Sequence, residues 1–208
     1  MADILNEQEQ VDAIKQFWRR YGLWIMVAII IVLLGLLGYR FWQNREQKIT
    51  AITSGMYEQM LVDVDQQNTA DMQANANLLM SRYPDSAYSA LAGLLLAQSQ
   101  VAKGQLSQAQ TSLQWVVNHA QDAHTVIIAK IRLARVLIAQ KQPQQALTTL
   151  QSIQNSAEAD MVKGDAHLAL NNIMAAQKAY QLSLSELQSS DPLYPLVQMK
   201  LANLPASS

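Results

Sequence analysis

The stretch AQSQVAKGQLSQAQTSL, residues 97–113, places a small residue, an alanine and a bulky residue at intervals of twelve and then four. The same intervals recur in ARVLIAQKQPQQALTTL, residues 134–150, and in GDAHLALNNIMAAQKAY, residues 164–180. The three sets are Ala97, Ala109 and Leu113; Ala134, Ala146 and Leu150; and Gly164, Ala176 and Tyr180. Their alanines lie 37 and 30 residues apart. A pattern that recurs at such intervals predicts repeated units, each made of two short helices.

Turn signals fall between the two halves of each unit, at Lys103-Gly104-Gln105, Lys141-Gln142-Pro143 and Asn171-Asn172. Two small residues per unit would let antiparallel helices approach closely. The pattern resembles the tetratricopeptide repeat, whose units stack into a helical solenoid. The alternative is an ordinary helical bundle in which the alanines coincide by chance.

Further units are expected on both sides of these three. A weaker copy with a longer turn is indicated by Gly55, Ala74 and Leu78. A last helix, started by Asp191 and Pro192, is expected to cap the array with its apolar residues, which are Leu193, Leu196, Val197, Leu201 and Leu204. No run of strand length alternates apolar and polar residues after the first forty. We therefore expect an all-α, tetratricopeptide-repeat-like domain over residues 43–208.

A separate segment precedes this domain. Residues 21–39, YGLWIMVAIIIVLLGLLGY, contain no charge and are bracketed by Arg20 and Arg40. As a helix they would rise about 28 Å, close to the thickness of a bilayer's hydrocarbon core. Aromatic residues stand at both ends, where headgroups would lie. The sequence predicts a transmembrane helix over residues 21–42, in preference to a buried core helix or a cleaved signal peptide.

The orientation of this span is not decided by charge, because three basic residues flank each side. Long domains translocate largely regardless of charge, which favours a cytoplasmic tail and an external domain. In the tail, residues 1–20, Asn6 and Glu9 indicate a capping box. Val11, Ile14, Trp18 and Tyr21 share one helical face, so an amphipathic helix at the membrane surface is expected, with a frayed tail as the alternative.

Composition excludes several function classes. The 208 residues carry a formal net charge of -1, and a protein that binds nucleic acid would need an excess of Lys and Arg. The sequence has no Cys, which excludes a disulfide scaffold and a thiol nucleophile. Its three histidines, His119, His124 and His167, have no metal-ligand spacing, and no phosphate-binding loop or nucleophile elbow occurs. The sequence thus predicts a protein that is not an enzyme and needs no cofactor.

Several segments together resemble one family over essentially the whole chain. They are VDAIKQF at residues 11–17, GYRFW at 38–42, IRLAR at 131–135 and QMKLANL at 198–204, in this order around a single span. The chain is similar to the YfgM family, the ancillary subunits of the bacterial SecYEG translocon. The resemblance implies an inner-membrane protein with a cytoplasmic tail and a periplasmic repeat domain. It also implies partnership with the SecYEG translocon and with PpiD, a membrane-anchored periplasmic chaperone of the prolyl-isomerase type.

The repeat register predicts a candidate peptide groove on the concave surface, formed by the first helix of each unit. Its residues are Leu91, Leu94, Gln98 and Val101; Ile128, Ile131, Arg135 and Ile138; and Met161, Asp165 and Leu168. Such a groove is mostly aliphatic and suits an apolar helix or an unfolded segment. The alternatives are that the terminal helix fills it, or that the register is shifted by one residue. Lys130, Arg132 and Arg135 form a basic cluster, interpreted as a solvated face or, alternatively, a partner contact.

These observations favour a membrane-anchored adaptor with chaperone-like contacts to translocating polypeptides near the translocon exit. A repeat array leaves an extended surface for other chains, and a membrane anchor raises the effective concentration of partners beside the channel. The alternative is a membrane-tethered regulator that binds a stress-response signalling factor.

Overall fold

The computed structural model describes the backbone of residues 2–205 and every side chain from 46 to 205, with part of the side chains between 18 and 40. Over these residues the chain is helical and contains no strand, as the sequence predicted. It divides into two compact units, Met1–Ile49 and Thr50–Ser208. The side chains of Asn6, Glu9, Val11 and Ile14 lie outside the described part. The backbone is helical from Ala2 onward, so Asn6 lies inside the first helix and the predicted N-cap at Asn6 is wrong.

The predicted span is described only in part, because the side chains of residues 21, 22, 25, 28, 29, 38, 41 and 42 are not in the described set. Counted over the described residues alone, no helix is long and apolar enough to cross a membrane. All the side chains of residues 30–37 are exposed.

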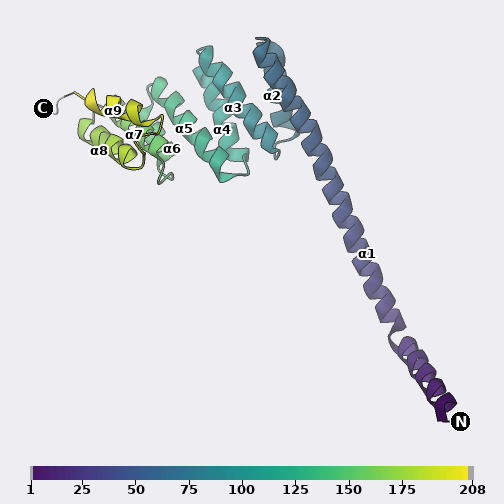
Figure 1. Cartoon of the computed structure of the whole chain (residues 1–208). Coiled ribbons are helices and arrows are strands. Elements are labelled where there is room, and N and C mark those ends of the chain that lie inside the picture. The colour runs from purple at the N-terminus through teal and green to yellow at the C-terminus, as the bar shows by residue number, and fades with distance from the viewer. Residues whose placement is uncertain (1, 206–208) are drawn as a thin grey trace. The chain divides into compact units, whose positions relative to one another are not determined.

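The helices follow one another with short connections (Figure 1). The first, α1, spans Ala2–Asp65 and includes residues 49–64, where apolar residues recur at helical spacing. The others are α2 (Thr69–Arg82), α3 (Ala87–Ala102), α4 (Leu106–His119), α5 (Ala123–Ala139), α6 (Pro143–Leu150), α7 (Ala157–Ala169), α8 (Ile173–Ser185) and α9 (Tyr194–Ala202). Several start at side-chain caps: Asn68, Ser86, Asp122, Ser156 and Asn172 each accept a hydrogen bond from a backbone N–H of the first turn.

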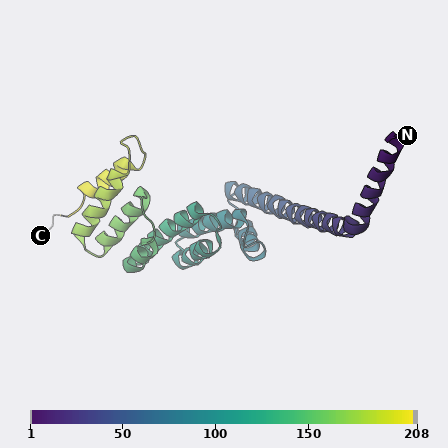
Figure 2. The same cartoon turned by 90° about the horizontal axis from the view of Figure 1, so that it is seen from below.

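The helices from α3 to α8 are arranged as stacked hairpins. Each helix packs against the next one along the chain, and α3 also contacts α5, as α5 contacts α7. The first helices of successive hairpins therefore lie side by side (Figure 2). This is the packing of a helical solenoid, in which each unit buries its apolar face against its neighbours.

The residues that define the repeat form the contact within each hairpin. All nine are buried: Ala97, Ala109, Leu113, Ala134, Ala146, Leu150, Gly164, Ala176 and Tyr180. The closest approach is at Gly164, where an added Cβ would lie 2.4 Å from Cε1 of Tyr180. The small residue at this position is thus required by the aromatic ring that packs on it, and the predicted hairpins are confirmed.

The hairpin turns share one backbone geometry. Gln67, Gly104, Lys141 and Asn171 have positive φ angles of 58°, 72°, 62° and 60°. In each turn the following residue donates its N–H to the carbonyl four positions before the positive-φ residue, for example from Asn68 to Asp63 at 2.8 Å and from Gln105 to Gln100 at 2.8 Å. This bond closes the helix end as in a Schellman motif, and only Gly104 adopts the conformation without steric cost.

The first hairpin of the repeat domain, formed by the end of α1 and by α2, has a different register from the one predicted. Gly55 and Ala74 are exposed and Leu78 is 44% exposed, so these residues do not form a hairpin contact. The buried residues are instead Met60, Met72 and Ala76, each 37 positions before Ala97, Ala109 and Leu113. In this hairpin the two small positions hold methionines, Met60 and Met72, and the bulky position holds Ala76. A search for small residues at these positions therefore placed the hairpin wrongly.

Two hydrophobic clusters form the core of the compact unit Thr50–Ser208. One is built around Met60, Met72 and Leu79 of the first hairpin, and the other runs from α3 to α9. The terminal helix joins the second cluster through the fully buried Val197, while Leu196 stays 39% exposed. Asp191 accepts a hydrogen bond from the backbone N–H of Leu193 at 2.8 Å just before α9, near its predicted start.

Candidate partner-binding surface

A pocket of about 360 Å³ lies between α3, α4 and α5. Its floor is formed by the buried side chains of Ala97, Leu113 and Val136. Its sides and rim are formed by Gln98, Val101, Leu106, Arg132, Arg135 and Ala139. Ala97 and Ala139 are small, so neighbouring helices leave space that their side chains do not fill. A mostly apolar pocket of this size with few polar groups is typical of a binding site.

The polar groups stand at the rim of the pocket. Gln98, Arg132 and Arg135 are exposed, and the two arginines are three residues apart in α5, on neighbouring positions of one helical face. Nη2 of Arg135 lies 2.8 Å from Oε1 of Glu158, in the first turn of α7. No described carboxylate pairs with Arg132. The rim is therefore cationic, with one guanidinium already paired.

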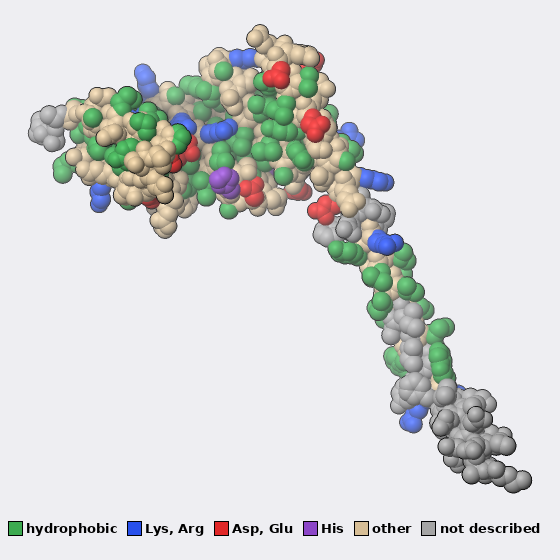
Figure 3. Space-filling view, in the orientation of Figure 1, with side chains coloured by type: hydrophobic (Ala, Val, Ile, Leu, Met, Phe, Trp, Pro, Cys, Tyr) green, Lys and Arg blue, Asp and Glu red, His purple; other side chains and the backbone are tan. Residues whose placement is uncertain are grey.

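The surroundings of the pocket are poor in charge. Neither α3 nor α4 contains a Lys, Arg, Asp or Glu residue. Figure 3 shows hydrophobic side chains spread over these central helices, with few charged side chains among them. Attraction to the two arginines is thus not weakened by acidic side chains on the two helices opposite them.

The hairpin α7/α8 carries an ionic contact at the repeat position of Gln98 and Arg135. Oδ1 of Asp165 accepts a hydrogen bond from the Tyr180 hydroxyl at 2.6 Å and one from Nζ of Lys200 at 2.7 Å. Burial of the ring, with Asp165 beside the hydroxyl, raises the pKa of Tyr180 far above its usual value. Because Lys200 belongs to α9, this contact joins the terminal helix to α7.

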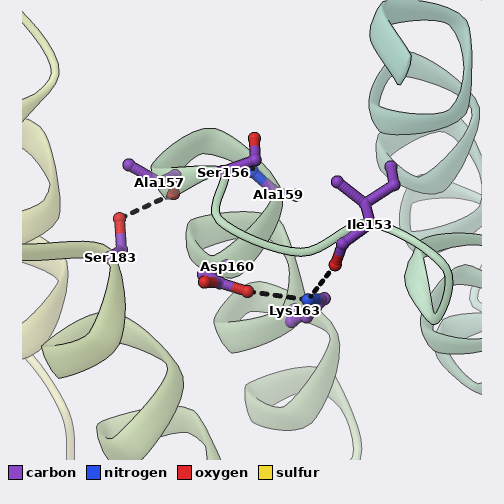
Figure 4. Close-up of polar contacts among 7 residues, drawn as sticks. All are labelled: Ile153, Ser156, Ala157, Ala159, Asp160, Lys163 and Ser183. Atoms are coloured by element: carbon purple, nitrogen blue, oxygen red, sulfur yellow. Dashed lines mark hydrogen bonds and ion pairs between the residues drawn. The ribbon is translucent and has the colours of Figure 1, made fainter. Parts of the chain in front are cut away.

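A second polar cluster holds the connection between α6 and α7 (Figure 4). Nζ of Lys163 donates to Oδ1 of the buried Asp160 at 2.7 Å and to the carbonyl of Ile153 at 3.0 Å. The hydroxyl of Ser183, in α8, donates to the carbonyl of Ala157 at 2.7 Å. Because these bonds end on backbone carbonyls and on a paired carboxylate, the cluster serves the packing of α6, α7 and α8.

The structure brings together three of the eleven predicted groove residues, Gln98, Val101 and Arg135, at the pocket. Leu91 and Leu168 are 37% and 38% exposed, and Ile128 and Ile138 are half-buried. Asp165 is bonded to Tyr180 and Lys200. The groove as a binding site stays a prediction.

Three members of the predicted groove lie in the core. Leu94, Ile131 and Met161 occupy one repeat position and are 7%, 2% and 2% exposed. Their side chains belong to the cluster that runs from α3 to α9, so they are not on an accessible surface. Arg132, the second guanidinium of the pocket, was predicted only as part of the basic cluster.

Within the described part of the chain, no group of His, Asp or Glu side chains could hold a metal ion. The ring of His119 stacks on Trp115 with centroids 4.3 Å apart, and its Nδ1 lies 2.8 Å from the Trp115 carbonyl oxygen. Burial lowers the pKa of His167. Packing thus accounts for the ring of His119, whereas Nδ1 of His167 is buried without a hydrogen-bond partner among the described residues.

Comparison with known proteins places this architecture. The profile of the family described as Tetratricopeptide repeat-like domain matches residues 15–206. The chain belongs to this tetratricopeptide repeat-like family. The family assignment agrees with the hairpins α3/α4, α5/α6 and α7/α8 and with their shared turn geometry.

Curated relatives of this tetratricopeptide repeat-like protein carry the name ancillary SecYEG translocon subunit. The relative from Neisseria gonorrhoeae is 30% identical over 127 residues, 59% of both chains. The relative from Haemophilus influenzae is 28% identical over 122 residues, again 59% of both. The Escherichia coli relative is 29% identical over 109 residues, 52% of both. The chain thus spans little more than half the length of these relatives, and the resemblance to ancillary SecYEG translocon subunits is confirmed.

Proposed function

We propose that this protein is a membrane-anchored adaptor of the Sec translocon, which handles exported polypeptides through contacts of its repeat domain. The observation that carries the proposal is its similarity to relatives named ancillary SecYEG translocon subunits. The stacked hairpins support it, because such an array offers an extended surface and, between α3, α4 and α5, an apolar pocket.

The anchor is the uncharged segment of residues 21–39, which has the length and the flanking aromatic residues of a transmembrane helix. Confinement beside the channel raises the local concentration of passing chains, so weak contacts suffice for function. The tail before the span is on the cytoplasmic side, and the domain after it is periplasmic. A PpiD-type membrane-anchored chaperone is the second partner in this proposal.

Association with the translocon is tested by affinity purification of the full chain from gently solubilised membranes. The expected result is enrichment of the SecY, SecE and SecG subunits, together with a periplasmic chaperone. A fusion of residues 1–49 to an unrelated soluble domain serves as the control, since it keeps the anchor and lacks the repeats. Recovery of neither the translocon nor a chaperone above this control would reject the proposal.

Topology is tested separately by adding protease to spheroplasts. The proposal predicts digestion of everything after about Trp42. Protection of the repeat domain would place it in the cytoplasm and would remove the role in handling exported polypeptides.

A further inference from the structure

Positive charge is concentrated in the two central hairpins, α3/α4 and α5/α6. Residues 87–156 contain five basic residues and one acidic residue; they are Lys103, Lys130, Arg132, Arg135 and Lys141, with Asp122. The whole chain, by contrast, has a formal net charge of -1. The pocket lies within this segment and has two of the five cations at its rim. A ligand that approaches it meets a positive potential, which favours an anionic group.

The pocket combines this charge with an apolar interior. Its floor of Ala97, Leu113 and Val136 is at most 4% exposed, whereas Val101 at its side is 43% exposed. An apolar side chain would therefore be buried against aliphatic carbon while an attached or neighbouring carboxylate reached the guanidinium groups. Arginine suits this role because its planar fork can bind both oxygens of a carboxylate.

Glu158 already forms an ion pair with one of these guanidinium groups, that of Arg135. The Arg135–Glu158 pair has an N–O distance of 2.8 Å, and its two side chains are 45% and 46% exposed. A solvent-exposed pair of this kind is weak, so an incoming carboxylate can replace Glu158 at small cost. Glu158 thus occupies the site that a partner's carboxylate would take.

We propose that this pocket binds a polypeptide segment with an apolar side chain next to an Asp or Glu side chain, and that the segment's carboxylate displaces Glu158 from Arg135. This inference rests on the proposed function and specifies which segments of a partner the adaptor recognises. Gln98 at the rim favours a polypeptide over a fatty acid, since its amide can both donate to and accept from a peptide group. An acyl chain offers no such partner.

The test measures fluorescence anisotropy of labelled peptides with the full chain in nanodiscs of neutral phosphatidylcholine. One peptide carries leucines and glutamates three and four positions apart, and a second has glutamine in place of each glutamate. We expect the acidic peptide to bind more tightly. Arg135→Gln should weaken its binding about tenfold, because charge-assisted hydrogen bonds are lost. Glu158→Gln should tighten it about two- to fivefold, because the competing carboxylate is gone.

Lys130→Gln is the matched control. Lys130 is in the same helix as Arg135 and loses the same charge, but it does not line the pocket and its Nζ is hydrogen-bonded to Ser152 at 2.9 Å. Its effect on the dissociation constant should stay within about twofold, in line with the small contribution of exposed charges. Melting temperatures of all three variants show whether a change in binding follows from unfolding.

Three results would overturn the inference. They are equal binding of the acidic and amide peptides, an unchanged or weakened affinity in Glu158→Gln, and Arg135-dependent binding of oleate in the absence of peptide binding. Translocon recovery is measured with the same variants to separate the two proposals. Recovery of the translocon without peptide binding rejects this inference alone, and peptide binding without the translocon rejects the proposed function alone.

Discussion

Nζ of Lys200 in α9 lies 2.7 Å from Oδ1 of Asp165 in α7, and the same oxygen accepts the hydroxyl hydrogen of Tyr180 at 2.6 Å. The terminal helix is therefore fastened by a carboxylate that also satisfies a buried phenol, since Tyr180 is fully buried in the core. Loss of Asp165 removes both contacts, whereas loss of Lys200 removes only one.

We predict unequal costs for these two losses. Asp165→Ala should lower the free energy of unfolding by about 1–3 kcal/mol, because it leaves the Tyr180 hydroxyl without its partner. Lys200→Ala should cost less than about 1 kcal/mol, as expected for a partly exposed ion pair. Chemical denaturation of both variants measures the difference, with the exposed Lys178→Ala as the control. Equal costs would show that Tyr180 does not depend on Asp165.

The close approach at Gly164 gives a prediction with an internal control. Gly164→Ala should destabilise the domain by about 1–3 kcal/mol, because the added Cβ would lie 2.4–2.9 Å from three atoms of the Tyr180 ring. Gly55→Ala should instead stabilise it by about 0.5–1 kcal/mol, because nothing lies within 4 Å of the Cβ and alanine favours a helix. Thermal unfolding measures both changes. A shift of the same sign in the two variants would contradict the described packing.

Some residues of the predicted groove are buried and others are exposed. Substitution by aspartate should distinguish the two groups. Ile131→Asp should cost several kcal/mol and unfold the domain, because Ile131 is 2% exposed and an unpaired charge would be buried. Val101→Asp should leave helicity and melting temperature nearly unchanged, because Val101 is 43% exposed at the pocket. Circular dichroism of the two variants checks the expectation. Stable folding of Ile131→Asp would mean that this position is open to solvent.

The hairpins could be predicted from sequence because their contacts need small residues, and these residues recur at a fixed spacing. Ala97, Ala134 and Gly164 carry that pattern. The first hairpin could not be found in this way, because Met60 and Met72 stand where the other units have small residues. Because Ala76 stands where the other hairpins have a bulky residue, the core can still be filled, but the pattern of small residues is lost.

The candidate site was harder to predict for a geometric reason. Successive helical positions differ by about 100° in direction, so a small rotation of a helix in the array moves a residue from surface to core. Leu91 is exposed, whereas the residue three positions later in the same helix, Leu94, is buried. The same shift of three positions buries Ile131 and Met161 in the next two hairpins. The pocket also depends on α4, whose Leu106 and Leu113 come from the second helix of the unit.

The start of α5 gives a pH dependence. Oδ1 of Asp122 accepts the Thr125 backbone N–H at 2.7 Å, and this hydrogen bond holds the pKa of the carboxyl below its ordinary value. Because the folded-state pKa is lowered, the stabilisation is present above the unfolded pKa and is lost as pH falls through the folded value. Asp122→Ala should therefore melt below wild type at neutral pH, and the difference should shrink in acid, because the protonated carboxyl still offers an oxygen to the Thr125 N–H but no charge. Asp122→Asn, which keeps an accepting oxygen, should lose this pH dependence. A difference in melting temperature that is the same at neutral pH and in acid would contradict the assignment.

The central claim is that the pocket between α3, α4 and α5 contacts polypeptides beside the Sec translocon. Photo-crosslinking in living bacteria tests it most directly, with a photoreactive amino acid at Val101 in the full chain and, as the control, at the exposed Gln114 of α4. Mass spectrometry of the adducts should identify exported polypeptides and translocon-associated proteins at Val101, and Arg135→Gln should reduce them. Equal adducts at Val101 and Gln114, or adducts at Val101 with cytoplasmic proteins alone, would contradict the account.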